Sequence, residues 1–364
     1  MSGLNDFYPA TGGGGPSEFD CVVDAAGNGD FTDFLTAWAA GNRYIGVKAG
    51  TYVITSDLLI DQTTEDLENT KYGVVGLDFG VNLVVNTPSW CLMNTDDNIW
   101  TQINKADTAD APIVTTAGSN LITTTGDFTT WVSSDGYVLQ PGMWFSPLFQ
   151  DYGANANQHS NIHRHKIVSI DSANQITLDS DMGVDSSGID YDIQQMTEHV
   201  HFENFTISRT VPGEEQPGLL YTAGIGAYRA RAVNIRCASS LAVADGDMYL
   251  MYNAAGRSNF WSAKNCKGIL SMPLEVGLGP HCVVEDCDIV RISPWDTAYA
   301  RYIGNTVIAT SVIDNSWGSL FVNNTLLFKP VGDQTAWQTT ACSDTNTFMN
   351  NVNAGWLKVA DIAV

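Results

Sequence analysis

The stretch Ala232-Val233-Asn234-Ile235-Arg236-Cys237 decides the fold, because its pattern recurs through the second half of the chain. In each copy an apolar or small residue lies two positions before an Asn or Asp, and further apolar or small residues follow one and three positions after it. The Asn and Asp positions are Asn204, Asn234, Asn265, Asp286, Asn305, Asn324 and Asn351. Their spacing of roughly 19 to 31 residues is typical of a solenoid in which each repeat forms one coil.

The Asn or Asp of each repeat is the natural place for the chain to turn. Side chains alternate along a straight strand, so the apolar positions on both sides of the Asn cannot all point inward unless the chain bends there. Asn and Asp tolerate the left-handed backbone region, and one such residue between two short strands restores the inward phase. Stacked corners can also join their side-chain amides in a ladder from coil to coil.

These features predict an all-β fold, a right-handed parallel β-helix, in which the repeated Asn and Asp residues form a structural corner ladder. The alternative is a β-sandwich with Asn-containing turns. A sandwich would show two-residue hairpin turns and alternation along whole strands. Here the turn is a single residue inside a continuous apolar segment, which favours the β-helix.

Residues 28–40 have the spacing of a short amphipathic helix. Its apolar positions are Phe31, Phe34, Leu35 and Trp38. Asp30 provides an N-cap, Asp33 follows three residues later, and Gly41 ends the segment. Because the end coil of a solenoid needs a cover, we expect residues 28–40 to form an N-terminal capping helix.

The segment that follows the helix resembles a known family. An apolar strand, then Lys48-Ala49-Gly50-Thr51-Tyr52 and another strand, is similar to the opening of pectate-lyase-like β-helix proteins. That superfamily includes pectin-modifying enzymes and bacteriophage tailspikes. The chain lacks the polygalacturonase carboxylates, the pectin methylesterase motifs and the pectate-lyase calcium cluster. The resemblance therefore implies the fold and favours the bacteriophage tailspike and virion-surface type over the pectin enzymes.

The chain divides into four parts by composition and rhythm. Residues 1–19 contain a Gly-rich stretch and are expected to form a flexible arm. Residues 20–111 hold the cap and the first coils. Residues 112–196 break the rhythm with short strands between turns, and resemble the small antiparallel β inserts of phage tailspike and fibre proteins. Residues 197–364 form the β-helix body.

Charge and hydropathy exclude several classes of partner. The formal charge is −23, with 17 Lys and Arg against 40 Asp and Glu. This balance argues against binding nucleic acid or an anionic membrane. No run of 18 apolar residues occurs, so we expect no membrane insertion. The start of the sequence has no signal-peptide pattern, so we expect synthesis in the host cytoplasm and localisation on a virion surface.

The cysteines and histidines do not indicate a cofactor. The seven cysteines are odd in number and contain no C-x-x-C motif. Cys266 and Cys287 hold the same repeat position, and we expect them to stack as free thiols in the core. The histidines have no metal-ligand spacing, so we expect neither a metal nor a cofactor.

Two groups of residues are candidates for chemistry or binding. Asp245 and Asp247 would share one face of a strand and provide paired carboxylates for glycoside hydrolysis. A solvated Asp-Gly-Asp turn explains the same residues and is the favoured interpretation. Trp261, Trp295 and Trp317 lie in turns. Their rings would stack on sugars, or would be buried in a subunit interface.

The sequence therefore favours a structural protein of a bacteriophage virion surface. It would be a tailspike, fibre or capsid-decoration subunit that forms a homotrimer, contacts other virion proteins, and acts in adhesion to host surface polysaccharide or in shell stabilisation. The second hypothesis is a polysaccharide depolymerase, either a lyase or a glycoside hydrolase. The third is a carbohydrate-binding protein without catalysis. Because the known enzyme motifs are missing, we expect the chain not to be an enzyme.

Overall fold

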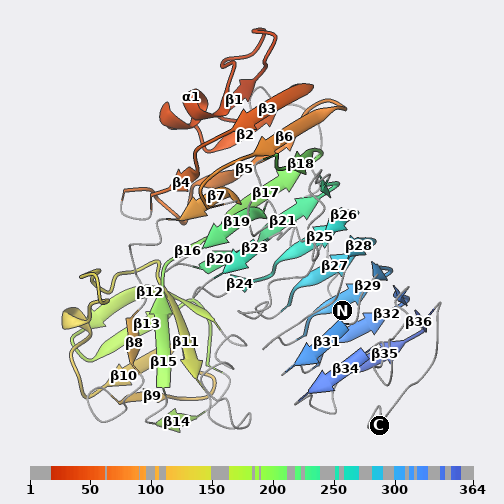
Figure 1. Ribbon diagram of the computed structural model, residues 1–364. Helices are drawn as coiled ribbons and strands as arrows, with labels where there is room; N and C mark the ends of the chain where they lie inside the picture. The colour runs from red at the N-terminus through yellow and green to blue at the C-terminus, as the bar shows by residue number, and fades with distance from the viewer. Residues whose placement is uncertain are drawn as a thin grey trace.

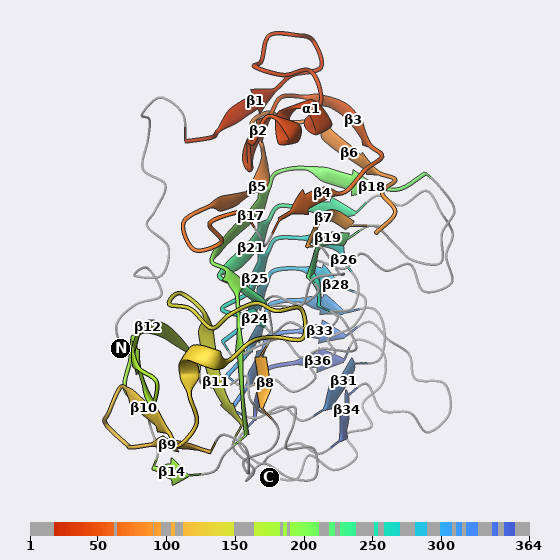
Figure 2. The ribbon, with the colours of Figure 1, turned by 90° about the vertical axis from the view of Figure 1, so that its left-hand side faces the viewer.

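The computed structural model describes residues 18–61, 64–89, 91–95, 103–105, 112–148, 164–182, 185–187, 190–210, 218–222, 226–237, 251–253, 258–269, 281–289, 299–307, 311–314, 318–326, 337–340 and 346–353. Over these residues the chain is a stack of coils with a capping helix at one end and a separate β subdomain beside it (Figure 1). The coils lie one below the other in the second view (Figure 2). The structure confirms the predicted all-β parallel β-helix.

Two long parallel sheets form the body of the solenoid. In the ten-stranded sheet the order is β1 (Cys21–Val23), β2 (Tyr44–Val47), β5 (Lys71–Gly76), β17 (His199–Glu203), β21 (Ala230–Val233), β25 (Ser262–Lys264), β27 (Val283–Glu285), β29 (Arg301–Ile303), β32 (Leu320–Val322) and β35 (Thr347–Met349). In the nine-stranded sheet it is β3 (Gly50–Ile54), β6 (Val81–Val85), β18 (Thr206–Ser208), β22 (Arg236–Cys237), β26 (Lys267–Ile269), β28 (Asp288–Ile289), β30 (Thr306–Val307), β33 (Thr325–Leu326) and β36 (Val352–Asn353).

Shorter parallel sheets complete the described part of the coils. One contains β23 (Met251–Asn253), β19 (Gly218–Thr222), β7 (Cys91–Thr95) and β4 (Leu58–Ile60). Another contains β16 (Met196–Thr197), β20 (Gly226–Tyr228) and β24 (Ser258–Asn259), and a pair is made by β31 (Ser311–Asp314) and β34 (Trp337–Thr340). The inward side chains form one continuous apolar core from Cys21 to Phe321.

The predicted corner exists between the ten-stranded and nine-stranded sheets. Asn204, Asn234 and Asn265 have φ between 51° and 61°, the left-handed conformation that the repeat required. Asn234 Nδ2 donates to Asn204 Oδ1 and Asn265 Nδ2 donates to Asn234 Oδ1, both at 2.7 Å. Asp286 continues the corner with φ 54°. In these coils the exposed corner ladder is the one that the sequence predicted.

In the last coils the corner lies one residue earlier than predicted. Gly304, Asn323 and Asn350 have positive φ, and they align with Asp286 through the register of the sheets. The residues predicted for the corner are the next ones along the chain, namely Asn305, Asn324 and Asn351. These three point inward and stack below Cys287, in the column that Phe205, Ile235 and Cys266 fill with apolar groups. The prediction is wrong for these three of the seven corner positions.

Asn305, Asn324 and Asn351, which point into the solenoid instead of forming the corner, make a second, inner amide ladder. Asn305 Nδ2 donates to Asn324 Oδ1, and Asn324 Nδ2 donates to Asn351 Oδ1, each at 2.9 Å. Each amide also donates to a backbone carbonyl of the previous coil, as Asn324 does to Tyr302. Asn305 and Asn324 are at most 1 % exposed. The interior of the last coils is thus held by hydrogen bonds where the earlier coils use apolar contacts.

Helix α1 (Phe34–Ala39) covers the first coil, as predicted (Figure 1). Its N-cap is Asp33, whose carboxylate accepts from the Thr36 amide at 2.8 Å. The prediction that Asp30 caps the helix is wrong, because the Asp30 carboxylate accepts from the Val22 amide. The buried face of the helix consists of Phe34, Ala37 and Trp38.

An antiparallel subdomain interrupts the solenoid between β7 and β16 (Figure 1). Its strands, in sheet order, are β14 (Ser186–Ser187), β9 (Ile113–Thr115), β10 (Leu121–Thr124), β13 (Gln175–Leu178), β12 (His165–Ser172), β11 (Trp144–Leu148), β15 (Asp190–Gln194) and β8 (Ile103–Lys105), and the 3₁₀ turn η2 covers Phe128–Thr130. Its buried side chains form a core of their own. Because β8 pairs with β15, the subdomain begins before residue 112, the start that the sequence suggested.

Cys266 and Cys287 are free and buried in neighbouring coils, as predicted. The Cys266 amide donates to the Cys287 sulfur at 3.4 Å. The hydrogen bond with Cys266, and burial after it, raise the pKa of the Cys287 thiol well above its usual range. The Cys287 sulfur therefore stays a protonated thiol near neutral pH, whereas the same contact lowers the pKa of Cys266.

Candidate functional site

The outer face of the ten-stranded sheet is organised in columns, because each outward side chain lies next to its register partner in the neighbouring coil. The first column runs Lys71, His199, Arg229, Phe260, His281, Tyr299 and Gly318. The second column runs Gly73, His201, Arg231, Ser262, Val283, Arg301 and Leu320. The face therefore collects residues that are far apart in the sequence.

The first column contains a second corner that the sequence did not reveal. Arg229, Phe260, His281 and Tyr299 all have φ between 53° and 66°, which is uncommon for bulky side chains. The His281 ring stacks between those of Phe260 and Tyr299, with centroids 5.0 and 5.4 Å apart. A Cβ at Gly318 would lie 2.8 Å from the Tyr299 ring. The ring faces of this column are thus occupied by neighbours, and the column stabilises the corner.

A hydrogen-bonded group of titratable residues lies where the second column begins. His201 Nδ1 is 3.1 Å from Tyr44 Oη, and His201 Nε2 is 2.9 Å from Glu203 Oε2. The Phe19 ring stacks on Tyr44 at 5.1 Å and covers it. His201 and Glu203 keep about a quarter of their side chains exposed, 23 % and 28 %. Arg231 is the register partner of His201 in the next coil.

The pKa shifts of Tyr44 and Glu203 give these two residues different roles in the group. Burial raises the pKa of Tyr44 to about 12, Glu18 and Glu203 act in the same direction, and Arg231 opposes them. The hydrogen bond from His201 lowers the pKa of Glu203. Near neutral pH Tyr44 is therefore a proton donor, and Glu203 is an ionised acceptor that orients the imidazole.

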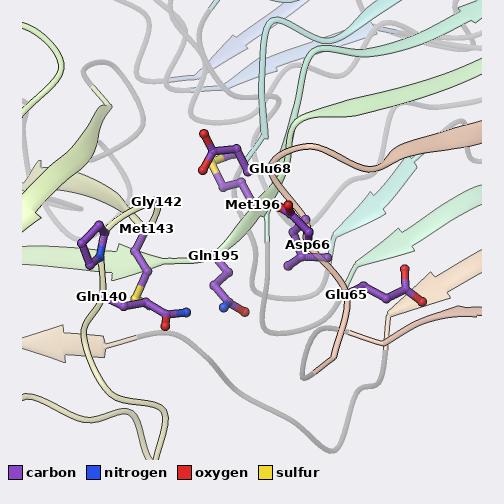
Figure 3. Close-up of a pocket in the computed structure, with 10 residues that line it drawn as sticks. Glu65, Asp66, Glu68, Gln140, Gly142, Met143, Gln195 and Met196 are labelled. Atoms are coloured by element: carbon purple, nitrogen blue, oxygen red, sulfur yellow. The ribbon is translucent and has the colours of Figure 1, made fainter.

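A small cleft of about 160 Å³ lies between the subdomain and the first coils. Gln140, Gly142 and Met143 line it from the subdomain, and residues 65–68 line it from the loop between β4 and β5. Figure 3 shows Gln195 and Met196 between these two walls, with the Gln195 amide directed toward the same space as that of Gln140. The lining thus combines carboxylates and amides with the apolar side chains of Leu67, Met143 and Met196.

The carboxylates of the cleft are held in place by partners on its walls. Glu65 pairs with Arg43 at 2.8 Å and accepts from Tyr72 Oη at 2.7 Å. Asp66 accepts from the Asn69 side chain and backbone, which lowers its pKa. These contacts fix the acceptor oxygens of the solenoid wall and neutralise part of their charge.

The amides behind the cleft are buried without protein partners among the described residues. Both polar atoms of Gln194 and the Gln195 Oε1 atom have no hydrogen-bond partner there, and Gln194 is fully buried. The Trp144 Nε1 and Thr197 Oγ1 atoms are also buried and have no hydrogen-bond partner among the described residues. Of these residues only Gln195 lines the cleft, so within the part of the chain that the structure describes its side-chain oxygen is the unpaired acceptor on this wall.

Lys166 joins the subdomain to the solenoid beside the cleft. Its Nζ lies 2.6 Å from both Glu68 and Glu198, and 5.9 Å from the centre of the Trp144 ring. Burial alone would lower the pKa of Lys166, but the hydrogen bonds to Glu198 and Glu68 outweigh it and raise the pKa. The ammonium group is therefore charged throughout the physiological range and acts as a clamp.

Lys166→Gln is expected to loosen the subdomain and to lower the free energy of unfolding by about 1–2 kcal/mol, because two partly buried carboxylates lose their cation. Hydrogen exchange measured by mass spectrometry should speed up in β11, β12 and β16. The control is Lys267→Gln, since Lys267 pairs with Asp288 at 3.8 Å on the exposed surface and should contribute less than about 0.5 kcal/mol. Equal effects of the two changes would show that Lys166 is not a clamp.

The part of the chain that the structure describes contains no group of three or more His, Cys, Asp and Glu residues arranged for a metal ion. Within the same residues, no helix has the length and apolar character needed to cross a membrane.

Of the residues predicted for catalysis and sugar binding, only Trp261 belongs to the part of the chain that the structure describes. Asp245, Asp247, Trp295 and Trp317 lie outside the described residues. Trp261 is 2 % exposed and belongs to the core of the solenoid. A ring without an exposed face cannot stack on a sugar, so the prediction of a glycan platform is wrong for Trp261.

Comparisons with known proteins give distant structural likenesses. No known protein-family model matches the sequence, and no curated protein matches it. The fold is similar to the tailspike protein gp49 from Pseudomonas phage LKA1, with 10 % identity and a TM-score of 0.44, over 81 % of this chain and 55 % of that one. It is similar to the tailspike gp61 of Pseudomonas phage phi297, with 11 % identity and a TM-score of 0.31, over 87 % of this chain and 65 % of that one.

A third likeness is to the gp54 tailspike of Acinetobacter baumannii bacteriophage AP22, determined in complex with A. baumannii capsular saccharide. Its identity is 10 % and its TM-score 0.32, over 88 % of this chain and 69 % of that one. The chain thus spans about half the length of the LKA1 tailspike. Likenesses this distant do not transfer a ligand or an activity, and membership of the pectate-lyase-like superfamily stays a prediction.

Proposed function

We propose that the chain is a bacteriophage virion surface protein, a tailspike, fibre or capsid-decoration subunit, that binds a glycan of the host surface. The observation that carries the binding role is the cleft between the subdomain and the first coils. The assignment to a virion follows from the sequence resemblance of the Lys48–Tyr52 segment and of the insert to tailspike proteins. Because this is an analogy of fold, the binding role depends on the cleft itself.

The chemistry of the cleft suits a sugar. Sugar hydroxyls both donate and accept hydrogen bonds, and the cleft offers amide donors and acceptors from Gln140 and Gln195 beside the carboxylate acceptors of the opposite wall. The apolar side chains of Leu67 and Met143 suit the C–H faces of a sugar ring. The volume is smaller than the roughly 300–1,000 Å³ of pockets that enclose a whole drug-sized ligand. It therefore fits one ring of a longer glycan.

Gln195→Leu is expected to weaken glycan binding about fivefold to tenfold, because it removes one neutral hydrogen-bonding group and keeps the volume. Binding is measured on immobilised bacterial surface polysaccharides by biolayer interferometry. The matched control is Gln175→Leu on β13, which does not line the cleft. If the parent protein binds no polysaccharide, the proposed function is wrong. If Gln195→Leu binds as the parent does, the cleft is not the binding site.

A depolymerase is the second candidate, favoured by the hydrogen-bonded group of Tyr44, His201 and Glu203. The partly exposed His201 imidazole and Glu203 carboxylate are groups of the kind that serve as acid and base in cleaving a glycosidic linkage, and the buried Tyr44 hydroxyl holds the imidazole in place. The discriminating observation is chemical. A depolymerase releases reducing ends or unsaturated uronate from a bound polysaccharide, whereas an adhesion protein leaves the polymer intact.

The remaining choices concern assembly. A virion subunit is expected to form a homotrimer and to co-purify with phage particles and other virion proteins. A carbohydrate-binding protein without a virion role would do neither. Light scattering of the purified chain measures its mass in solution, and proteomics of purified particles tests the virion location.

A further inference from the structure

We infer that the glycan bound by this chain is anionic, and that its acidic groups lie along the outer face of the ten-stranded sheet. This inference rests on the proposed function, and it names the class of substrate. It starts from a reversal of charge on one face of a strongly acidic protein.

The reversal is clear from the outward residues of β5 to β29, corners included. The basic ones are Lys71, Arg229, Arg231, Lys264 and Arg301, and the acidic ones are Glu203, Glu285 and Asp286. The whole chain has 40 acidic and 17 basic side chains. An ordinary solvated surface of this protein would therefore carry more than twice as many carboxylates as cations, whereas this face carries more cations than carboxylates.

One acid of the face forms an ion pair with a lysine, and a second lies beside a histidine. Glu285 binds Lys264 at 3.1 Å, and Glu203 lies 2.9 Å from His201. Lys71, Arg229 and Arg301 have no carboxylate within ion-pair distance among the described residues. The face therefore has cationic charge that its own carboxylates do not neutralise.

Aromatic rings position two of these cations where carboxylates would normally do so. The Arg229 guanidinium lies 5.1 Å from the centre of the Tyr228 ring, and the Lys71 ammonium lies 5.9 Å from that of Tyr44. A ring holds a cation without neutralising it, so the charge stays available to a ligand. The Arg229 Nε atom is buried without a hydrogen-bond partner in the part of the chain that the structure describes.

The register of the strands aligns Lys71, His199, Arg229, Arg231 and Arg301 in a row across neighbouring coils, and we call this row the basic track. Lys71, His199 and Arg229 follow one another in neighbouring coils, and Arg231 lies beside Arg229 in the second column. Neighbouring parallel strands lie about 4.8 Å apart, so the five steps from Lys71 to Arg301 span roughly 24 Å. That length suits several residues of an extended polymer. The track begins beside Glu198 and Lys166, close to the cleft.

The negative charge of the rest of the protein also bears on which class of glycan can bind. A net charge of −23 repels a polyanion at long range, so an anionic polymer is held only where the local potential is positive. The rest of the surface then keeps the polymer on this face. A neutral glycan would gain nothing from such a distribution of charge.

The test compares polymers that differ in charge alone. Binding of the purified chain is measured at about 50 mM and about 300 mM NaCl against dextran sulfate and dextran, and against polygalacturonate and its methyl ester. A phosphate-bearing teichoic acid forms a fifth arm. Binding to at least one acidic polymer, absence of binding to the neutral counterparts, and at least a tenfold loss at the higher salt concentration are expected, because binding releases counterions from the polymer. The arms show whether sulfate, carboxylate or phosphate is preferred.

Two double variants locate the site. Lys71→Gln with Arg301→Gln removes two exposed cations of the track and should weaken binding about tenfold at low salt. Arg236→Gln with Lys267→Gln removes the same charge from neighbouring strands of the nine-stranded sheet and should change binding less than about twofold. Thermal unfolding of all variants checks that the fold is kept.

The outcomes separate this inference from the proposed function. Binding to neutral polymers as strong as to acidic ones, or equal losses in the two double variants, overturns the inference of an anionic glycan on the basic track, while the proposed glycan binding stands. Failure to bind any polymer, here and on the bacterial polysaccharides, overturns both.

Discussion

Gly73→Ala is expected to destabilise the chain by roughly 3 kcal/mol or more and to lower the yield of folded protein sharply. A Cβ at this position would lie 1.9 Å from the carbonyl oxygen of His201, in the strand next to it. The oxygen belongs to the backbone of β17, so it cannot move without breaking the pairing of β5 with β17. That pairing joins the first coils to the rest of the solenoid. The measurement is the free energy of unfolding in denaturant.

The matched control is Gly80→Ala. Gly80 also has a positive φ, of 86°, but nothing lies within 4 Å of an added Cβ. This change therefore adds backbone strain without a clash, and should cost about 1 kcal/mol. If Gly73→Ala is no worse than Gly80→Ala, the close approach of β5 and β17 is not a constraint on the fold.

Asn324→Leu is expected to cost about 3–5 kcal/mol, although the leucine side chain has a similar size. The change removes the side-chain acceptor of the Asn305 backbone and side-chain amides and the side-chain donor to the Tyr302 carbonyl, whereas the Asn351 side-chain oxygen keeps only the backbone amide of residue 324. Each buried polar group left unsatisfied costs about 1–3 kcal/mol. Hydrogen exchange should report the loss first in β30 and β33, which flank the inner ladder.

The outer ladder supplies the comparison for this prediction. Asn234→Gly removes two hydrogen bonds of 2.7 Å, but they are exposed and water replaces them, and glycine adopts the φ of 55° without strain. Its cost should be below about 1 kcal/mol. Similar losses for the two changes would mean that the inner and outer ladders contribute alike.

The sequence was sufficient to predict the coils because one short polar residue at each corner satisfies two demands at once. It adopts the left-handed backbone, and it ladders with its neighbours, as Asn204 and Asn234 show. The prediction failed by one residue where two candidates are adjacent. In Asn323-Asn324 and in Asn350-Asn351 either residue suits the corner, and only the packing inside decides which one turns.

The second corner was beyond sequence reasoning for a physical reason. Phe260, His281 and Tyr299 have side chains that disfavour a positive φ, so no local rule points to them. These residues adopt a positive φ because the stacking of their rings along the column offsets the backbone strain.

The candidate site could not be predicted from the sequence, because only the register of the neighbouring parallel strands brings its residues together. The alternation His199-Val200-His201 was the one local signal, since it places two imidazoles on one face. Nothing local indicates that Tyr44 lies next to His201, 157 residues away in the sequence, or that Arg229 follows His199 in its column. The cleft is similar, because Gln140 and Glu65 come from parts of the chain that only the docking of the subdomain brings together.

The place where the subdomain leaves the solenoid also sets the order in which the molecule can form. Most coils follow the preceding coil after a short loop. In contrast, β6 pairs with β18 across the whole subdomain, and the Asn86 side chain donates to the Thr210 hydroxyl, 124 residues away in the sequence. Closing so long a loop costs about 1 kcal/mol more in chain entropy than closing a loop of one ordinary coil. Nascent chains are thus expected to mature in two blocks, and the folding of the intervening sheet draws the two halves of the stack within reach of each other.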